Sequence, residues 1–222
     1  ATKRIACAKE AGYALFGRGN NFIVINNGID LSRFSYKPAI RKDTRIELNI
    51  PQDATVLLNI ARFQEVKNHT YLIDVFKEYI KIHPNSHLLL VGDGPLRNTI
   101  ENKVRKLKLA NCISFTGVRS DTEKMYNSAD IFVMPSIFEG LPVVLIEAQA
   151  NRLPCIVSDS IDHDVKINDN FNFLNIHLAP SEWATAIKLC KKRRGQKSHK
   201  LDKLYDIKNI VKQLASIYKE VL

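Results

Sequence analysis

Two carboxylates, Glu139 and Glu147, lie eight residues apart around the predicted start of a helix. The apolar run Ile131–Met134 precedes them and leads into the turn Pro-Ser-Ile-Phe-Glu-Gly-Leu-Pro. The N-terminus of a helix favours anions, because its unpaired amides and its dipole attract negative charge. Carboxylate oxygens accept hydrogen bonds from hydroxyl groups. The segment therefore indicates a site for a ligand that carries both phosphates and hydroxyls, such as a nucleotide sugar.

The residues between the two glutamates predict how the backbone would meet such a ligand. Gly140 allows close approach because it has no Cβ, and Pro142 in the first helical turn sacrifices no hydrogen bond. The amides of Gly140, Leu141 and Val143 are then free to face a phosphate or a sugar. The structural alternative is that the first glutamate complements the helix dipole and the second forms a surface salt bridge.

Two basic side chains, Arg62 and Lys67, follow the apolar run from 56 to 61. A guanidinium group offers a planar fork for two phosphate oxygens and an ammonium group is a compact charge, so the pair could clamp a diphosphate. On their own, these residues would be interpreted as solvent-exposed charges at a strand end and a helix start. The glutamates downstream favour the functional interpretation.

Val118 and Arg119 follow another apolar run, from 112 to 116. They could frame a nucleobase, with backbone groups pairing with its edge and the arginine stacking on it; an ordinary loop is the alternative. The run 92–94 fits Gly-x-Gly, but Arg97 stands where the third glycine of a dinucleotide fingerprint would be. We therefore expect a tight turn there, and not an NAD-dependent dehydrogenase.

The elements that must position these residues alternate along the chain. Fully apolar runs alternate with segments of helical periodicity, which predicts an α/β fold with a Rossmann-like, doubly wound parallel sheet. The predicted strands are 22–25, 56–61, 88–91, 112–116, 131–134 and 154–157. Ligands bind at the carboxyl ends of such strands, where all the candidate residues lie. A polar connection is expected over 35–51, and Asn68 is expected to cap a helix.

Four parts are predicted along the chain. Residues 1–21 are expected to form a hinge helix from an N-terminal acceptor domain that this sequence lacks, and residues 22–190 the ligand-binding domain. Residues 191–205 are predicted to be a basic linker, and residues 206–222 a C-terminal amphipathic helix capped by Asp206.

The formal net charge of +10 predicts an anionic partner, such as a nucleotide diphosphate, a nucleic acid or a membrane surface. The basic residues are scattered and not set among aromatic residues, which disfavours nucleic acid. The four cysteines are far apart and the six histidines show no motif, so no metal site is predicted. Unpaired thiols suit a reducing cytosol, and neither a membrane span nor a signal peptide is visible.

Several segments together resemble the group 1 (family 4) retaining glycosyltransferases. The segment 135–148 is similar to their Glu-x7-Glu signature, and the segment 61–69 to their Gly-Arg-x4-Lys-Asn phosphate motif. Further similar segments are 24–34, 91–95, 115–117 and 129–136. Two departures stand out: Ala61 replaces the usual glycine, and no Gly-Gly loop follows Asp159, so phosphate contacts from that second loop are not expected.

The resemblance implies the C-terminal, donor-binding half of a GT-B enzyme, closest to those that build bacterial capsular or other surface polysaccharide. It implies that Arg62 and Lys67 hold the leaving diphosphate. It also implies that Glu139 positions the donor sugar and that Glu147 holds the ribose. Transfer would proceed with retention, without a cofactor or an essential metal, from a UDP-linked sugar to a glycan or lipid-linked acceptor. Because the acceptor domain is lacking, the chain is expected to bind donor but to turn over little.

Two other functions remain open. One is a non-catalytic nucleotide-sugar-binding module, which the complete set of two basic and two acidic site residues disfavours. The other is a sugar-nucleotide epimerase, which would release an epimerised nucleotide sugar without an acceptor. A cytoplasmic location is expected. The basic run 191–200 could touch an anionic membrane at its inner face, where a lipid-linked acceptor would lie; a solvated linker is the alternative.

Overall fold

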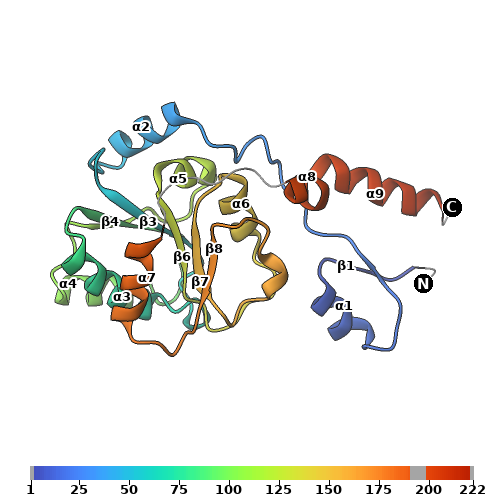
Figure 1. Cartoon of the computed structure of the whole chain (residues 1–222), viewed down its shortest axis with the longest axis horizontal. Helices are drawn as coiled ribbons and strands as arrows, with labels where there is room; N and C mark the ends of the chain where they lie inside the picture. The colour runs from blue at the N-terminus through green and yellow to red at the C-terminus, as the bar shows by residue number, and fades with distance from the viewer. Residues whose placement is uncertain (1–2, 191–198, 221–222) are drawn as a thin grey trace.

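A six-stranded parallel sheet forms the centre of the molecule (Figure 1). The structure is a computed structural model, and it describes residues 3–190 and 199–220. The strands are β3 (Thr55–Ile60), β4 (Ser86–Val91), β5 (Ile113–Phe115), β6 (Ile131–Met134), β7 (Cys155–Ser158) and β8 (Phe171–Leu174). Their order across the sheet is β5-β4-β3-β6-β7-β8, and every neighbouring pair is parallel. The predicted α/β class with a doubly wound parallel sheet is confirmed.

Helices cover both faces of this sheet. One face carries α3 (His69–Ile82), α4 (Arg97–Lys106) and α7 (Pro180–Leu189), and the other carries α2 (Pro38–Glu47), α5 (Thr122–Ser128) and α6 (Val143–Ala150). Successive side chains of a strand point to opposite faces. Leu57 of β3 therefore packs in the apolar cluster between the sheet and α3, the α3 core. Val56 and Leu58 pack in the cluster on the other face, between the sheet and α5, the α5 core. Burial on both faces explains the uninterrupted apolar runs.

The strand order changes direction between β3 and β6. The chain runs outward from β3 through β4 to β5, and then returns to the other side of β3 as β6. At such a point the loops that leave two adjacent strands diverge to opposite faces and leave room for a ligand. The loop after β3 carries Arg62 and Lys67, and the loop after β6 carries Glu139.

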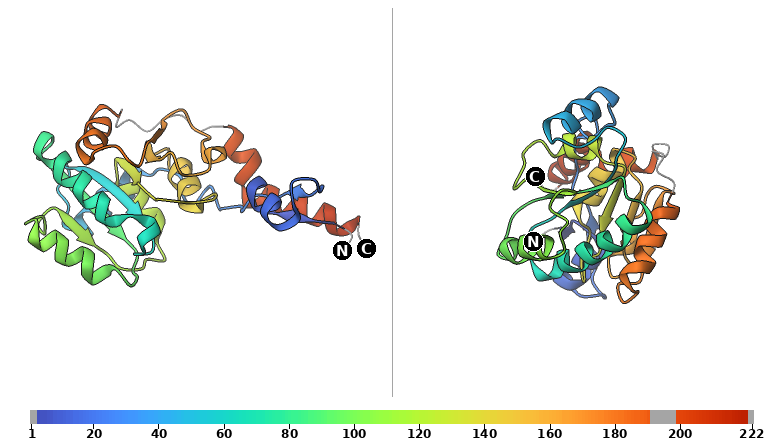
Figure 2. Two further views of the ribbon diagram at one scale, coloured as in Figure 1. Left: turned by 90° about the horizontal axis from the view of Figure 1, so that it is seen from below. Right: turned by 90° about the vertical axis from the view of Figure 1, so that its left-hand side faces the viewer.

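A smaller unit lies beside the sheet domain and contains both ends of the described chain (Figures 1 and 2). It contains β1 (Ile5–Ala6), α1 (Lys9–Phe16), β2 (Ile23–Val24), α8 (His199–Tyr205) and α9 (Ile207–Lys219). β1 and β2 pair in parallel, so the strand predicted at 22–25 exists but lies outside the central sheet. The helix expected within residues 1–21 is α1, and β1 precedes it.

The segment after β2 packs tightly against α8 and α9. The amide of Ile29 donates to the carbonyl of Tyr205, and the amide of Ile207 donates to the carbonyl of Ile29. A Cβ on Gly28 would lie 2.9 Å from the Cα of Ile207, so glycine is needed at this crossing. The predicted amphipathic helix is confirmed as α9, and the carboxylate of Asp206 caps it by accepting from the amide of Lys208 at 2.9 Å.

Three local predictions need correction. Of the predicted basic linker, residues 199–205 form α8, because Leu201 and Tyr205 bury their side chains in the α5 core; residues 191–198 lie outside the described residues. Asn68 occupies the N-cap position of α3 but adopts a left-handed conformation, and its side chain makes no capping hydrogen bond. Strand β8 was not predicted, because the polar Asn172 interrupts its apolar pattern.

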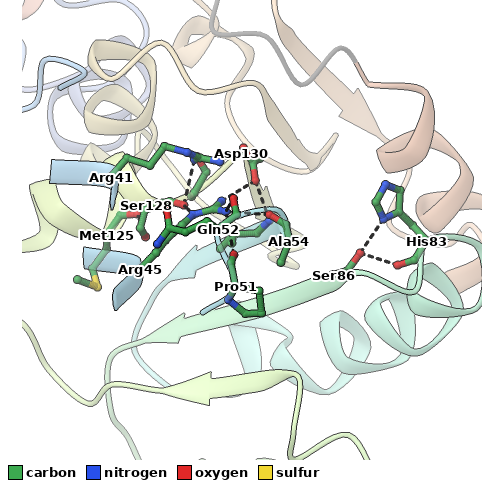
Figure 3. Close-up of polar contacts among 12 residues, drawn as sticks. Arg41, Arg45, Pro51, Gln52, Ala54, His83, Ser86, Met125, Ser128 and Asp130 are labelled. Atoms are coloured by element: carbon green, nitrogen blue, oxygen red, sulfur yellow. Dashed lines mark hydrogen bonds and ion pairs between the residues drawn. The ribbon is translucent and has the colours of Figure 1, made fainter. Parts of the chain in front are cut away.

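The polar connection expected over 35–51 contains the helix α2, which packs through arginines instead of apolar residues (Figure 3). Arg45 is fully buried, and its guanidinium donates to the carboxylate of Asp130 at 2.8 Å and to the carbonyls of four residues, Pro51, Gln52, Ala54 and Ser128. Arg41 donates to the other oxygen of Asp130 at 2.7 Å. A buried charge is tolerated when it is paired and fully hydrogen-bonded, and such a pattern is invisible to hydrophobic periodicity.

Candidate functional site

A cavity of about 450 Å³ opens at the carboxyl ends of β3, β4 and β5. It is lined by Ile60, Ala61, Arg62, Val91, Gly92, Asp93, Val118, Arg119, Thr122 and Val144. The last two residues belong to α5 and α6, so the cavity lies where the strand ends meet two helices. This is the edge at which the sequence predicts ligand binding, and three predicted site residues, Arg62, Val118 and Arg119, line the cavity together.

Arg62 presents a positive charge to this cavity. Its side chain is exposed, and within residues 3–190 and 199–220 it forms no salt bridge. The amide oxygen of Gln64, when it is turned toward Arg62, accepts from Nε at 2.9 Å. A neutral partner of this kind orients the guanidinium and leaves its charge available to an anion.

The turn that carries Arg62 is held by two glycines of β4's exit loop. Gly92 has a φ of +130°, and a Cβ there would lie 2.1 Å from the carbonyl oxygen of Ala61. A Cβ on Gly94 would lie 2.6 Å from the carbonyl oxygen of Phe63. The amide of Phe63 also donates to the carbonyl of Asp93 at 2.9 Å. These contacts support the interpretation of Gly92-Asp93-Gly94 as a tight turn, and they fix the backbone at Arg62.

Lys67 and Glu139 form an ion pair with each other. Lys67 ends a short 3-10 helix, η1 (Glu65–Lys67), and the amide of Ile137 donates to the carbonyl of Val66 at 2.8 Å, which ties the loop after β6 to the loop after β3. The Glu139 side chain is 13% exposed and that of Lys67 is 21% exposed, so water screens the pair only partly. Neither residue lines the cavity, but both lie at the same switch point.

The backbone between the two glutamates is open where a ligand would approach. Among residues 3–190 and 199–220, no atom outside Gly140 and its chain neighbours lies within 4 Å of the position that a Gly140 Cβ would take. Pro142 stands at the N-cap of α6 with φ −74°, and Val143 is the first helical residue. Leu141 and Val143 also pack their side chains on the α5 core, which fixes the first turn of the helix. The N-terminus of α6 is therefore free to receive negative charge.

Glu147 lies one turn after Val144, half-buried on α6. The hydroxyl of Tyr126 on α5 donates to its Oε2 at 2.7 Å. Burial raises the pKa of Glu147, while the Tyr126 hydrogen bond and the charge of Arg33 oppose that shift. The guanidinium of Arg33 is itself bound by Glu123 of α5, at 2.7 Å and 2.9 Å. Glu147, the residue predicted to bind the ribose, is thus a partly desolvated carboxylate next to the cavity wall.

Val118 and Arg119 differ in what they offer to the cavity. The Val118 side chain is largely exposed and supplies apolar surface. The guanidinium of Arg119 is bound by Asp121 at 2.7 and 2.8 Å and by Glu47 at 2.9 Å, and this contact lowers the pKa of Asp121 to about 2. Stacking of Arg119 on a base would have to compete with these two carboxylates. The backbone and the aliphatic part of its side chain are the parts best placed to frame a base.

His69, next to the candidate site in sequence, is buried beneath it. Its ring packs edge-on to Phe63, with ring centroids 4.4 Å apart, and neither ring nitrogen has a hydrogen-bond partner within the described part of the chain. Burial and the nearby Lys67 lower its pKa to about 4, so the ring is neutral. Among the described residues, no group of three histidines, cysteines or acidic residues could hold a metal ion. In the same part of the chain no helix is long and apolar enough to cross a membrane.

Sequence reasoning missed the residues that support Glu147 and the far wall of the cavity: Arg33, Asp93, Glu123, Thr122, Tyr126 and Val144. Tyr126 stands in a short helix with apolar neighbours, so it was indistinguishable from a core residue. A hydroxyl in such a position needs a polar partner, and that requirement was the one available signal.

Residues 40–211 match the protein family described as "Glycosyl transferases group 1". The chain belongs to this family. The glycosyltransferase EpsF of Bacillus subtilis is 39% identical over 169 residues, which cover 74% of this chain and 44% of EpsF. The Escherichia coli UDP-Gal:alpha-D-GlcNAc-diphosphoundecaprenol alpha-1,3-galactosyltransferase is 33% identical over 70% of this chain and 41% of its own length. The chain therefore spans less than half the length of these relatives.

The fold is that of GT-B glycosyltransferases. Anabaena HepE, solved in complex with UDP and glucose, superposes with a TM-score of 0.84 at 20% identity, over 99% of this chain and 63% of HepE. Sucrose-phosphate synthase from Thermosynechococcus elongatus superposes with a TM-score of 0.77 at 24% identity, over 98% of this chain and 57% of that protein. These likenesses confirm the Rossmann-like architecture that the sequence predicts.

Proposed function

We propose that this chain binds a nucleotide sugar, a UDP-linked one, as the donor for retaining transfer to a glycan or lipid-linked acceptor. The observation that carries the proposal is the cavity at the strand ends, which joins Arg62 to the apolar surface of Val118 and lies one helical turn from Glu147. In a nucleotide, the base needs an apolar slot, the ribose needs an acceptor for its hydroxyls, and the diphosphate needs a cation. Val118, Glu147 and Arg62 offer these three groups along one edge of the sheet.

Each residue has a role that follows from its chemistry. Arg62 and Lys67 would neutralise the diphosphate as it leaves with its bonding electrons, and preorganised donors of this kind supply much of an enzyme's rate. The open N-terminus of α6, at Gly140–Val143, would add amide donors. Glu147 would accept from the ribose hydroxyls, and Glu139 from hydroxyls of the transferred sugar. The charge is carried by these groups, so we propose that no essential metal is needed.

The names of relatives support the biological setting. Relatives include EpsF and a diphosphoundecaprenol-directed galactosyltransferase, and HepE was solved with UDP. On this basis we propose that the chain acts in bacterial surface polysaccharide synthesis, in the cytoplasm and against the inner face of the membrane. The net charge of +10 favours such peripheral contact with anionic lipids.

Calorimetric titration with UDP, GDP and ADP tests the proposal. We expect UDP to bind selectively, and the double variant Arg62→Ala/Lys67→Ala to abolish that binding. The matched control is Lys81→Ala/Arg105→Ala, which removes the same charge from exposed positions. Within the described part of the chain, these two side chains hydrogen-bond to Glu78 and Asn102. If the control loses as much affinity as the site variant, general electrostatics and not a donor site accounts for binding. Failure of all three nucleotides to bind would contradict the proposal for this chain.

A further inference from the structure

The Tyr126 side chain reaches Glu147 from inside the protein core. It is fully buried, and its hydroxyl donates to Glu147 Oε2 at 2.7 Å and lies 3.1 Å from the Val144 carbonyl. The ring packs edge-on to Phe34, with centroids 5.8 Å apart, and stacks with Phe132 at 5.9 Å. Because the ring is held on both sides, the position of its hydroxyl is fixed as well.

The hydroxyl and the carboxylate lie one helical turn from residues that line the cavity. Thr122 and Val144 line the cavity. Tyr126 follows Thr122 by four residues on α5, and Glu147 follows Val144 by three residues on α6. Residues three or four apart in a helix lie on the same side of it. The Tyr126–Glu147 pair is therefore one turn further along both helices than the residues that line the cavity, on the same side of each helix.

One oxygen of Glu147 is taken by Tyr126, and Oε1 has no hydrogen-bond partner among residues 3–190 and 199–220. A half-buried carboxylate with one bound and one unbound oxygen is incomplete by itself, because carboxylates in such places normally use both oxygens. Arg33 lies in the segment before α2, and its guanidinium donates to the Glu123 carboxylate and to the Ser120 carbonyl. The open oxygen is thus left for a group that enters from the cavity.

We propose that Tyr126 is a positioning residue of the donor site: its hydroxyl fixes Oε2 of Glu147 and so turns Oε1 toward the ribose hydroxyls of the bound nucleotide. This inference rests on the proposed function, because it assigns a residue to the recognition of that same ligand. Tyr126 does not touch the nucleotide itself. It acts by preventing the carboxylate from rotating, which removes conformational freedom that binding would otherwise have to restrict.

The variant Tyr126→Phe deletes the hydroxyl and keeps the ring in the core. We measure binding of UDP and of 2′,3′-dideoxy-UDP, which lacks both ribose hydroxyls, by calorimetry. Loss of one hydrogen bond to a charged group is expected to weaken UDP binding about tenfold. Binding of the dideoxy nucleotide should change little, because it offers Glu147 nothing to accept from. The tyrosine therefore matters only when the ribose hydroxyls are present.

Tyr71→Phe is the matched control. The Tyr71 hydroxyl donates to the Leu178 carbonyl at 2.6 Å on the opposite face of the sheet, and neither residue lines the cavity, so the same atom is lost from a hydrogen bond outside it. It should bind both nucleotides as the wild type does, and thermal unfolding of both variants records the cost to stability.

Three outcomes separate the failures. If Tyr126→Phe binds UDP as the wild type does, or weakens both nucleotides equally, the positioning role is wrong although the donor site stands. If the wild type binds UDP and the dideoxy nucleotide equally, the ribose role of Glu147 fails, and the positioning role fails with it. If the wild type does not bind UDP, the proposed function itself is contradicted.

Discussion

Lys67 and Glu139, two side chains that are predicted to bind the ligand, form an ion pair and neutralise each other's charge. A diphosphate that takes Lys67 must compete with a carboxylate that is mostly buried. A donor sugar, in contrast, would engage Glu139 at the same moment. The pair would thus favour ligands that occupy both halves of the site over a free nucleotide diphosphate, which would be the product of the proposed transfer.

Glu139→Gln tests this exchange of partners. The substitution keeps the shape and removes the charge, so Lys67 is released to the diphosphate. We expect UDP to bind several-fold more tightly, in line with the 1 kcal/mol or so of a partly exposed ion pair, while the UDP-sugar gains less or loses affinity. Calorimetry with both ligands gives the ratio. An equal change for the two ligands would show that Glu139 does not distinguish them.

Glu147→Gln separates ligand binding from stability. Because burial raises the pKa of Glu147, the folded protein holds this proton more tightly than the unfolded chain. The stability from this group is therefore present at acidic pH and is lost as pH rises through the folded pKa. Arg33, Glu123 and Tyr126 are the charged and titratable groups that face it.

The free energy of unfolding of the Glu147→Gln variant should consequently equal or exceed that of the wild type at pH 8. The difference between the two free energies should shrink toward pH 4. UDP affinity of the wild type should fall as Glu147 is protonated, whereas the variant should be weak at every pH. Urea unfolding and calorimetry at several pH values measure both effects. A variant that is less stable than the wild type at pH 8 would contradict the sign of this argument.

At the scale of elements, two glycines in neighbouring loops serve different purposes. Gly92 has the positive φ and the close approach to Ala61 that exclude a side chain, whereas Gly140 faces open space. We expect Gly92→Ala to cost about 2 kcal/mol or more of stability, from backbone strain and steric overlap. Gly140→Ala should leave stability within about 0.5 kcal/mol and reduce UDP affinity. Chemical unfolding and calorimetry of the two variants, one the control of the other, decide between these roles.

The same elements show what sequence alone could predict. β6 and the stretch 88–91 of β4 are uninterrupted apolar runs, and only Asn59 interrupts the run from 56 to 60 in β3. Strands that are buried on both faces have this pattern, so their place in a parallel sheet was readable. The ends of these strands carry Arg62 and Glu139, and topology brings them together. α2 was missed because its packing face contains Arg45, whose charge is satisfied by Asp130 and carbonyls distant in sequence. Such long-range compensation leaves no periodic signal.

Side-chain pairing was equally beyond the sequence. Arg119 was predicted to frame a base, yet nothing in its spacing indicated that Glu47 and Asp121 would bind its guanidinium. Lys67 and Glu139 were predicted to hold different parts of a ligand, and spacing could not indicate that they contact each other. Local sequence therefore identified residue types and the sheet edge, whereas the partner of each charge depended on loops that approach from elsewhere in the fold.

At the scale of the whole molecule, the site is an open edge. Val118 is 80% exposed, Arg62 is exposed, and nothing covers Gly140. Charge stabilisation by fixed donors is strong when water is excluded and weak when water competes. The chain spans 44% of EpsF, and the small unit that contains β1, α1 and α9 lies beside the sheet domain. Binding and turnover should therefore be separable in this chain.

We expect the chain to bind UDP but to transfer sugar at least a hundredfold more slowly than a typical enzyme, which turns over about 10 times per second. Release of UDP from a UDP-sugar, followed with and without a glycan acceptor, measures this rate, and calorimetry on the same sample confirms that the site is occupied. The Arg62→Ala/Lys67→Ala variant gives the background of release. Acceptor-dependent release at an ordinary enzymatic rate would contradict this prediction, because it would mean that the open edge excludes enough water for its fixed donors to stabilise the departing diphosphate.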